Sequence, residues 1–445
     1  MEAVEAVQVT CDILLEPYHS PFSPPQFPQN AEFPLTPFDV ATYNCHICIL
    51  YAFRPPMPDN AALREGLARA LVYFPHLAGR FDSDEYGYPK VVLNDAGIRL
   101  KEAIAPSTLE EHLPFDPSAS FLTLHPHPAE GVEVLLQIQL TRFSCGGLTL
   151  GITVHHHIAD GSSLCHFLLT WAKLVQGRDV GTMPFFGWSS VCAPRIPARV
   201  EFDHLGVEFR PKSGATRPRT NVGINLSKMC NQSFHFSNEF IGKLKAIVNG
   251  GDPGQRVTTF LSVLTHIWKK ITFVRRLPDN EMTQVRLTVN GRPRIKPPVP
   301  PEYYGNLVLW AHPKLTVGEV LRSSYSHVAQ VIREAIVKVD DGYFRSFMDF
   351  GEQLKGKGGA EIVVTLPEVG DFLNPNIEIS SWLSLQFHQL DFGGGVPAAL
   401  LTPGLPVEGL MMLVPSCGEG GGVDLHLCLE KSQAANMRQV MHSLD

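Results

Sequence analysis

Apolar and polar side chains alternate most regularly in residues 145–161, which read CGGLTLGITVHHHIADG. Every second residue from 148 to 154 is aliphatic, so these side chains share one face of a predicted strand. His156 continues that face, whereas His155 and His157 point to the opposite side. The pattern therefore predicts an imidazole that is carried inward at the end of a buried strand.

Helical spacing follows this strand directly. Residues 163–175 place large apolar side chains three and four positions apart, and a serine is available to cap the helix. The same reasoning predicts helices over 61–73 and 257–271, and strands over 44–53 and 132–143. Strand and helix patterns are thus mixed along the whole chain.

The stretch 183–220 interrupts this order. It is rich in proline and arginine, shows no sustained periodicity, and is long for a loop within one compact domain. We interpret it as the crossover between a first lobe, residues 1–182, and a second lobe, residues 221–445. The predicted fold is a two-lobed α/β protein with mixed sheets, and such proteins commonly bind ligands between their lobes.

Composition narrows the classes of function. The chain has 445 residues, of which 44% are hydrophobic and 18% charged, and its formal net charge is −7. This apolar content excludes a disordered chain, and an acidic chain without a long Lys/Arg run lacks the electrostatic footprint of a nucleic-acid binder. No stretch approaches 18 uncharged apolar residues, so no membrane-spanning helix is expected. Nine cysteines, an odd number, and an N-terminus without signal-peptide features favour a cytoplasmic protein.

The histidine segment is open to several interpretations. A single inward histidine is more often a satisfied core residue than a catalyst. A metal site is not expected, because three consecutive strand histidines diverge and only His156 and Asp160 could meet. A serine hydrolase would need a G-x-S-x-G elbow, which the chain lacks. A general base remains possible, since a strand end holds the ring rigidly while the following turn leaves one ring nitrogen accessible.

Several motifs in a fixed order extend this view. They are HHIADG at 156–161, FPHLAGRF at 74–81, CGG at 145–147, NGRPR at 290–294, YYGN at 303–306, SSW at 380–382 and DFGGG at 391–395. Together they resemble the motifs of the plant BAHD acyltransferases, which move acyl groups from coenzyme A thioesters to alcohols or amines. LTPFDVATYN and TFVRRLP resemble monocot N-hydroxycinnamoyl and N-benzoyl transferases. The resemblance covers nearly the whole chain and implies a chloramphenicol-acetyltransferase-like fold with the active site in a channel between two lobes.

The resemblance also implies roles for individual residues. His156 would be the general base, and Asp160 would point away from the substrate and pair with Arg292 to hold the turn that presents His156. Gly161 would let the backbone pass close by at this turn. Asp391 is labelled a second proton acceptor by similarity, although the family's DFGWG segment lies away from the active-site centre and supports the fold.

Two further expectations concern coenzyme A and the fold. Thr258 and Thr259, at the start of the predicted helix over 257–271, match the region that meets coenzyme A, or they form an ordinary N-cap. Acyl-CoA would be a co-substrate, with no permanently bound cofactor. Gly394 stands where the family has tryptophan, and we expect a modest structural consequence.

The acceptor is argued from the segment ahead of Trp382. Members that acylate shikimate or quinate use an arginine there, whereas residues 362–379 contain no arginine or lysine and carry Glu368, Asp371 and Glu378. An anionic acceptor would find no partner, and an amine would find a carboxylate. The expected substrate-pocket residues are Ile47, Ile49, Glu368 and Trp382.

The sequence therefore predicts a monomeric enzyme that forms a phenolamide from an aromatic acyl-CoA and an amine such as tryptamine, tyramine, agmatine or putrescine. Its partners would be small-molecule substrates. One alternative is an ester-forming transferase with an alcohol acceptor such as shikimate or quinate. Another is a non-catalytic member that only binds a ligand or a partner.

Overall fold

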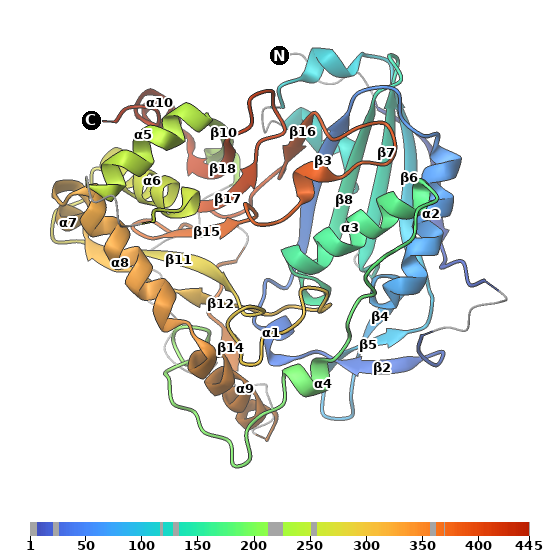
Figure 1. The fold of residues 1–445 in the computed structure, drawn as a ribbon, viewed down its shortest axis with the longest axis horizontal. Coiled ribbons are helices and arrows are strands. Elements are labelled where there is room, and N and C mark those ends of the chain that lie inside the picture. Colours follow the sequence, from blue (N-terminus) through green and yellow to red (C-terminus); the bar gives the residue numbers. More distant parts are fainter. Residues whose placement is uncertain are drawn as a thin grey trace.

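The computed structural model describes residues 7–20, 26–115, 119–127, 133–211, 226–250, 256–356, 362–368 and 370–444. Two lobes lie side by side in Figure 1, one drawn mainly in blue to green and the other mainly in yellow to red. Each lobe contains a large sheet and its own buried apolar core. The predicted two-lobed mixed α/β architecture is confirmed.

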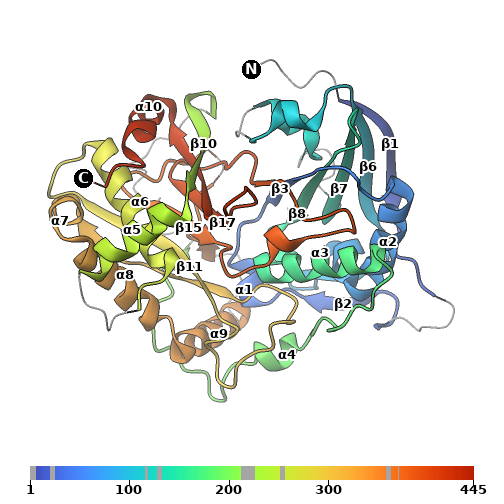
Figure 2. The same ribbon diagram turned by 45° about the horizontal axis from the view of Figure 1, so that its top comes forward.

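A six-stranded sheet forms the centre of the first lobe. Its strand order is β1 (Gln8–Leu15), β6 (Ile98–Ala105), β7 (Leu136–Phe143), β8 (Leu148–His155), β3 (His46–Phe53) and β16 (Ala399–Leu401). All neighbours are antiparallel except β6 and β7. Helices α2 (Asn60–Tyr73) and α3 (Gly161–Val175) cover one face of this sheet, as both ribbon views show (Figures 1 and 2). A small sheet of β2 (Ala31–Pro34), β5 (Pro89–Leu93) and β4 (Arg80–Ser83) lies beside it.

A seven-stranded sheet forms the second lobe. Its order is β10 (Met229–Phe236), β18 (Val423–Glu430), β17 (Leu410–Pro415), β15 (Ile377–Ser381), β11 (Met282–Asn290) and β12 (Val308–Ala311), and β13 (Lys314–Thr316) pairs with β11. The helices around it are α5 (Asn238–Asn249), α6 (Thr259–Arg275), α7 (Val317–Arg322), α8 (Tyr325–Lys338), α9 (Asp341–Gly356) and α10 (Lys431–Val440). β15 runs parallel to both β11 and β17.

The elements expected from periodicity are present. The strand over 44–53 is β3, the helix over 61–73 is α2, and the helices over 163–175 and 257–271 are α3 and α6. The strand expected over 132–143 is β7, which begins at Leu136, and residue 132 lies outside the described part. The predicted and observed elements agree best where apolar residues recur three and four positions apart in a helix, or alternate along a strand, because these patterns are the strongest.

The chain does not divide into lobes at one point along the sequence. β16, far into the predicted second lobe, pairs with β3 as an edge strand of the first sheet. Phe392 and Leu400 lie in the core of the first lobe, whereas Phe38, from α1 (Pro37–Val40), lies in the core of the second. The predicted boundaries at 182 and 221 therefore do not assign every segment to its lobe. Each lobe also contains a segment from the other half of the chain.

Hydrogen bonds to a buried side chain hold the described part of the predicted crossover in place. Its described part contains α4 (Trp188–Val191) and β9 (Phe209–Pro211), which pairs with β14 (Ile362–Val364). The backbone N–H groups of Arg195 and Arg199 donate to the buried carboxylate of Asp349, over 2.7 and 2.8 Å. These contacts tie the segment to α9; residues 212–220 lie outside the described part.

Candidate active site

A cavity of about 320 Å³ lies between the lobes. The first lobe contributes Thr42, Tyr43, His156, Asp160, Gly161 and Ser162, and the second lobe contributes Phe260, Thr288, Asn290, Val308, Trp310, Glu378 and residues 380–385. The volume is within the range of sites that enclose a small ligand. We call this cavity the catalytic pocket.

His156 reaches the catalytic pocket from the end of β8. The inward side chains of that strand, at positions 148, 150, 152 and 154, are fully buried in the first core. The strand ends at His155, and His156 begins a short 3₁₀ turn, with its N–H donating to the carbonyl of Cys45 over 2.9 Å. His155 packs between Phe81 and His46 on the other side, as the alternation predicted.

The electrostatics of His156 suit a proton acceptor. Burial lowers the pKa of His156, opposed in part by its own backbone carbonyl, the charge of Asp160 and the side chain of Asn306. The ring is therefore neutral at pH 7. Nδ1 of this ring is buried and has no hydrogen-bond partner among the described residues, and the side chain lines the catalytic pocket.

The expected ion pair between Asp160 and Arg292 is present and buried. Arg292 donates from Nη1 to Oδ2 over 2.7 Å and from Nη2 to Oδ1 over 3.1 Å. Asp160 is also the N-cap of α3, because its Oδ1 accepts from the N–H of Ser163 over 2.9 Å. The N–H of Leu307 donates to Oδ2 over 3.1 Å. The carboxylate thus points away from the cavity centre and fixes the turn that carries His156.

A second set of contacts holds the backbone of His156. Asn306 donates from Nδ2 to the carbonyl of His156 over 2.9 Å and to Oδ1 of Asp39 over 2.9 Å. Asp39 is buried, and its Oδ2 accepts from the N–H and hydroxyl of Thr36. Burial raises the pKa of Asp39. Asp39 and Asn306 had no predicted role, although they occur in the segments LTPFD and YYGN that carried the resemblance.

Gly161 lies where the first helix turn passes the second lobe. A Cβ at this position would lie 3.0 Å from Nε1 of Trp382 and 3.0 Å from Cδ1 of Leu385. The absence of a side chain therefore permits the expected close approach. Trp382 is mostly buried and lines the catalytic pocket, as predicted.

Thr258 is the N-cap of α6. Its hydroxyl accepts from the N–H of Leu261 over 3.2 Å, and Thr259 is the first residue of the helix. The side chain of Phe260, one position further, lines the catalytic pocket. The start of α6 thus lies at the edge of the cavity.

Three of the expected pocket residues lie elsewhere. Ile49 is fully buried in the first core, and Ile47 packs against that core. Glu368 is exposed in a turn, where its N–H donates to Asp371 over 2.6 Å. The carboxylate that lines the catalytic pocket is Glu378 on β15, which is 2% exposed. The assignments of Ile47, Ile49 and Glu368 are therefore corrected.

Asp391 also lies outside the catalytic pocket. Its Oδ1 accepts from the N–H groups of Gly393 and Gly395 over 2.7 and 2.9 Å, and its carbonyl accepts from Gln176 at the end of α3. The next residue, Phe392, packs edge-on against Trp171 with ring centroids 4.8 Å apart. The carboxylate stabilises its own loop and does not line the catalytic pocket, so its role as a second proton acceptor stays a prediction.

The tryptophan of the family's DFGWG segment would not fit at Gly394. A Cβ built there would lie 2.0 Å from the carbonyl oxygen of Pro56 and 2.7 Å from the sulfur of Met57. The 391–395 loop therefore lies so close to Pro56 and Met57 of the first lobe that no side chain fits at position 394. This is the structural consequence of the departure at this position.

The described residues contain no group of three or more His, Cys, Asp or Glu side chains placed to hold a metal ion. In the same part of the chain, no helix is long and apolar enough to cross a membrane.

Comparisons with known proteins agree with this geometry. The model of the Transferase family matches residues 22–444. Tryptamine hydroxycinnamoyltransferase 2 of Oryza sativa subsp. japonica is 40% identical over 416 residues, which cover 92% of this chain and 93% of that protein. Agmatine coumaroyltransferase-1 of Hordeum vulgare is 38% identical over 413 residues, covering 93% of each.

Solved structures show the same fold at lower identity. Vinorine synthase has a TM-score of 0.73 at 21% identity, covering 97% of this chain and 96% of that chain. TRI101 of F. sporotrichioides, complexed with coenzyme A and T-2, has a TM-score of 0.69 at 19% identity, covering 92% and 97%.

A histidine at a strand end that faces a cavity between two such lobes defines the class of protein, an acyl-CoA-dependent acyltransferase. The chain belongs to the Transferase family, the BAHD acyltransferases, and the resemblance seen in the sequence is confirmed.

Proposed function

We propose that this protein transfers an aromatic acyl group from its coenzyme A thioester to a primary amine and so forms an amide. The observation that carries the choice of acceptor is Glu378, a buried carboxylate in the wall of the catalytic pocket. Relatives that are 36 to 40% identical are named as transferases of tryptamine, agmatine and putrescine, and they support the same class of acceptor.

The proton transfer follows from the position of His156. Nε2 accepts a proton from the amine nitrogen as this nitrogen attacks the thioester carbonyl. The tetrahedral intermediate then collapses, the C–S bond breaks, and the coenzyme A thiolate leaves with the proton returned from the imidazolium. No covalent acyl-enzyme is required. Because burial lowers the pKa of His156, the imidazolium gives its proton up readily in the second half of the reaction.

Two groups hold this base in position. The Asp160–Arg292 pair fixes the turn after His156, and Asn306 fixes its carbonyl. Both sets of partners are buried, so their hydrogen bonds are not in competition with water. They act on the orientation of the ring and do not touch the substrate.

Coenzyme A would approach the start of α6. The exposed Thr258 and the free N–H groups of the first helix turn suit phosphate oxygens. Phe260, in the same turn, faces the catalytic pocket and would lie near the acyl end of the thioester. An enzyme with this geometry requires no resident cofactor for the step.

The acceptor end of the catalytic pocket is acidic. Tyr43 lies beside Glu378, and burial and the negative charge of Glu378 both raise the pKa of the Tyr43 hydroxyl. A primary ammonium ion would be attracted to the carboxylate of Glu378. The hydroxyls of Thr288 and Ser380, which also line this pocket, are hydrogen-bonded to each other over 2.9 Å.

An acceptor screen tests the proposal. p-Coumaroyl-CoA and benzoyl-CoA are supplied with tryptamine, tyramine, agmatine and putrescine, and in parallel with shikimate, quinate and a fatty alcohol, and release of coenzyme A is followed with a thiol reagent. We expect release with amines only. Release with the alcohols and not with the amines would establish the ester-forming alternative, and no release with any acceptor would support a binding-only protein.

Two glutamate variants locate the amine site. Glu378→Gln removes the charge from the pocket wall and is expected to raise KM for the preferred amine at least tenfold. Glu368→Gln is the matched control, because Glu368 lies on the surface of the same segment, and its KM should stay within twofold. Equal effects of both variants would contradict the assignment of Glu378.

A further inference from the structure

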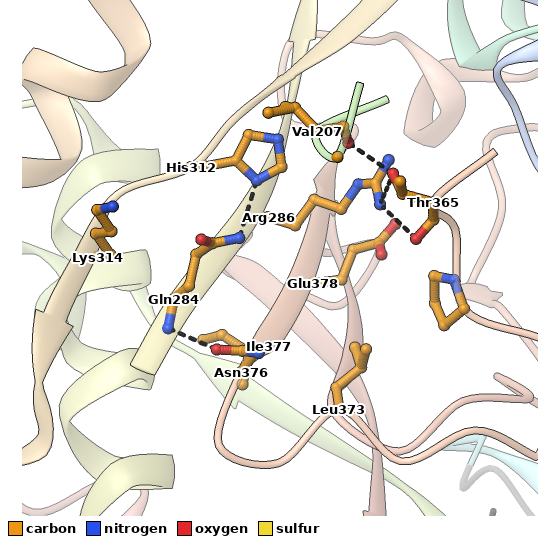
Figure 3. A pocket seen from close by; sticks show the side chains of 12 residues that line it. Val207, Gln284, Arg286, His312, Lys314, Thr365, Leu373, Asn376, Ile377 and Glu378 are labelled. Atoms are coloured by element: carbon orange, nitrogen blue, oxygen red, sulfur yellow. Dashed lines mark hydrogen bonds between the residues drawn. The ribbon is translucent and has the colours of Figure 1, made fainter. Parts of the chain in front are cut away.

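A second cavity of about 250 Å³ lies beside the catalytic pocket (Figure 3). Its lining residues are Gly206, Val207, Gln284, Arg286, His312, Lys314, Thr365, Pro367, Leu373, Asn376, Ile377 and Glu378. Glu378 lines both cavities. We call the second cavity the distal pocket.

The two pockets occupy one face of the same sheet. Along β11, Gln284 and Arg286 line the distal pocket, and Thr288 and Asn290, on the same face, line the catalytic pocket. Gln284 and Thr288 are four positions apart, which corresponds to about 13 Å along a strand. A ligand that lies along this face would therefore reach from one pocket into the other.

A row of side chains marks the boundary between the pockets. Arg286 and Glu378 are register partners on the parallel strands β11 and β15, and both point to this face. The guanidinium carbon of Arg286 lies 4.2 Å from the ring centroid of Trp310, which lines the catalytic pocket. The boundary thus carries a carboxylate and a guanidinium side by side.

The distal pocket is rich in buried donors. Arg286 is 9% exposed, and within the described part of the chain its Nε and Nη2 have no hydrogen-bond partner. Its Nη1 donates to the carbonyl of Thr365 over 3.3 Å. The amide of Gln284 donates to Nδ1 of His312 over 3.1 Å, which leaves the ring proton on Nε2, another buried nitrogen with no partner among the described residues.

Positive charges outnumber negative charges among the side chains that line this cavity. Arg286 and the exposed Lys314 are cations, and the single carboxylate is Glu378. His312 is neutral, because burial and the nearby charge of Arg286 lower the pKa of His312 to about 3. Buried donors without partners are costly, so a ligand that supplies oxygen acceptors would be stabilised here. A second cation would meet two cations, Arg286 and Lys314, and only one carboxylate, Glu378.

We propose that the distal pocket binds the far end of the amine acceptor and selects primary monoamines whose far end is a neutral or anionic oxygen acceptor, against diamines and guanidino-amines. The inference rests on the proposed function. It narrows the amine class, because the relatives' names include both monoamines and dicationic amines. Arg286 is the residue that makes the distinction.

A series of acceptors of one chain length tests this proposal with the full chain and p-coumaroyl-CoA. The series is 1,4-diaminobutane, 4-aminobutan-1-ol and 4-aminobutanoate, with amide formation measured by mass spectrometry. We expect kcat/KM for the amino alcohol and the amino acid to exceed that for the diamine at least tenfold. A preference for the diamine would overturn the proposal while leaving the proposed function intact. Absence of amide with every amine would instead overturn the proposed function.

Variants connect the preference to the distal pocket. Arg286→Met keeps an unbranched apolar stem over Trp310 and should shift the preference at least tenfold toward the diamine, whereas Arg286→Lys should retain it. Arg438→Met, on the exposed face of α10, is the charge control and should leave the preference unchanged. An unchanged preference in Arg286→Met would overturn the proposal. If that variant does not fold, Lys314→Met at the rim should give a smaller shift in the same direction, and no shift there would overturn the proposal equally.

Discussion

The neutral His156 ring has a direct consequence for the rate. Because burial lowers its pKa, the base is ready throughout the neutral range, and the amine determines the pH dependence. An alkylamine has a pKa near 10 and only its neutral form attacks, so that form increases about tenfold per pH unit between pH 7 and 9. We expect kcat/KM to rise in parallel when the rate is measured from pH 6.5 to 9.5.

A weakly basic fluorinated ethylamine is the control for this pH profile. It is already neutral at pH 7, so its profile should be flat over the same range. A flat profile for an ordinary alkylamine would contradict the proposed proton transfer.

Asn306 should influence the rate without influencing binding. It does not line the catalytic pocket, but it holds the carbonyl of His156 and is itself held by Asp39. Asn306→Ala should lower kcat by about 10- to 100-fold with KM nearly unchanged, because small displacements of a catalytic group are costly. Asn238→Ala, at an exposed asparagine of α5, is the control. Steady-state kinetics on material checked for folding would detect the difference, and a rise in KM with kcat retained would contradict a positioning role.

Individual site residues were predictable to very different degrees. The HxxxDG segment indicated His156 and Asp160 because strand alternation and a capped helix meet there. The acceptor carboxylate was harder, since Glu368 and Glu378 occur in the same cation-free segment and only the strand register of β15 shows which faces the cavity. The one available signal was that Glu378 and Ser380 are two positions apart and so share one face of a strand. The boundaries of a strand in so short a segment are too uncertain for this spacing to identify the carboxylate that faces the cavity.

The 391–395 loop lies away from the catalytic pocket, as the resemblance implied. The loop follows the pocket residues at 380–385 closely along the chain, yet it folds back onto α3 of the first lobe. The sequence shows that residues 391–395 follow the pocket residues closely along the chain. It does not show in which direction the backbone runs after Trp382. The loop stabilises the fold through Phe392 and through hydrogen bonds to Asp391.

Asp391→Ala distinguishes a structural role from a catalytic one. Loss of two side-chain hydrogen bonds should reduce the free energy of unfolding by about 1–3 kcal/mol. The expected result is a thermal midpoint lower by a few degrees and a kcat within twofold of the unmodified enzyme. A loss of kcat by two orders of magnitude at an unchanged midpoint would support the catalytic assignment.

At the scale of the whole molecule, the lobes are joined by exchanged segments. β16 completes the first sheet from the second half of the chain, and Phe38 reaches the second core from the first half. The elements were predictable from local periodicity, but these long-range pairings depend on complementary edges and cores that no local pattern records. The catalytic pocket depends on them, because both lobes supply its walls.

Buried histidines predict sensitivity of the whole fold to acid. Burial lowers the pKa of His155 to about 2 and that of His266 and His426 to about 4. The unfolded chain binds protons at these groups below about pH 6.5, whereas the folded chain does not, so each group costs up to about 1.4 kcal/mol per pH unit below that value. We expect the thermal midpoint to fall steadily from pH 6.5 to 4.5 in differential scanning fluorimetry.

A single variant assigns part of this sensitivity. His426→Gln removes one of the three groups and should make the decline with pH shallower. A midpoint that does not change between pH 6.5 and 4.5 would show that these histidines are not held neutral by burial.

The central claim is an amide-forming acyl transfer with His156 as the base. It is tested most directly by competition between tryptamine and tryptophol, which differ only in the nucleophile, at equal concentration with p-coumaroyl-CoA and with the products separated by mass spectrometry. We predict that amide exceeds ester at least a hundredfold, and that His156→Ala lowers the rate of amide formation by two to four orders of magnitude. Ester in equal or greater amount, or amide formed by the variant at nearly the original rate, would contradict the account.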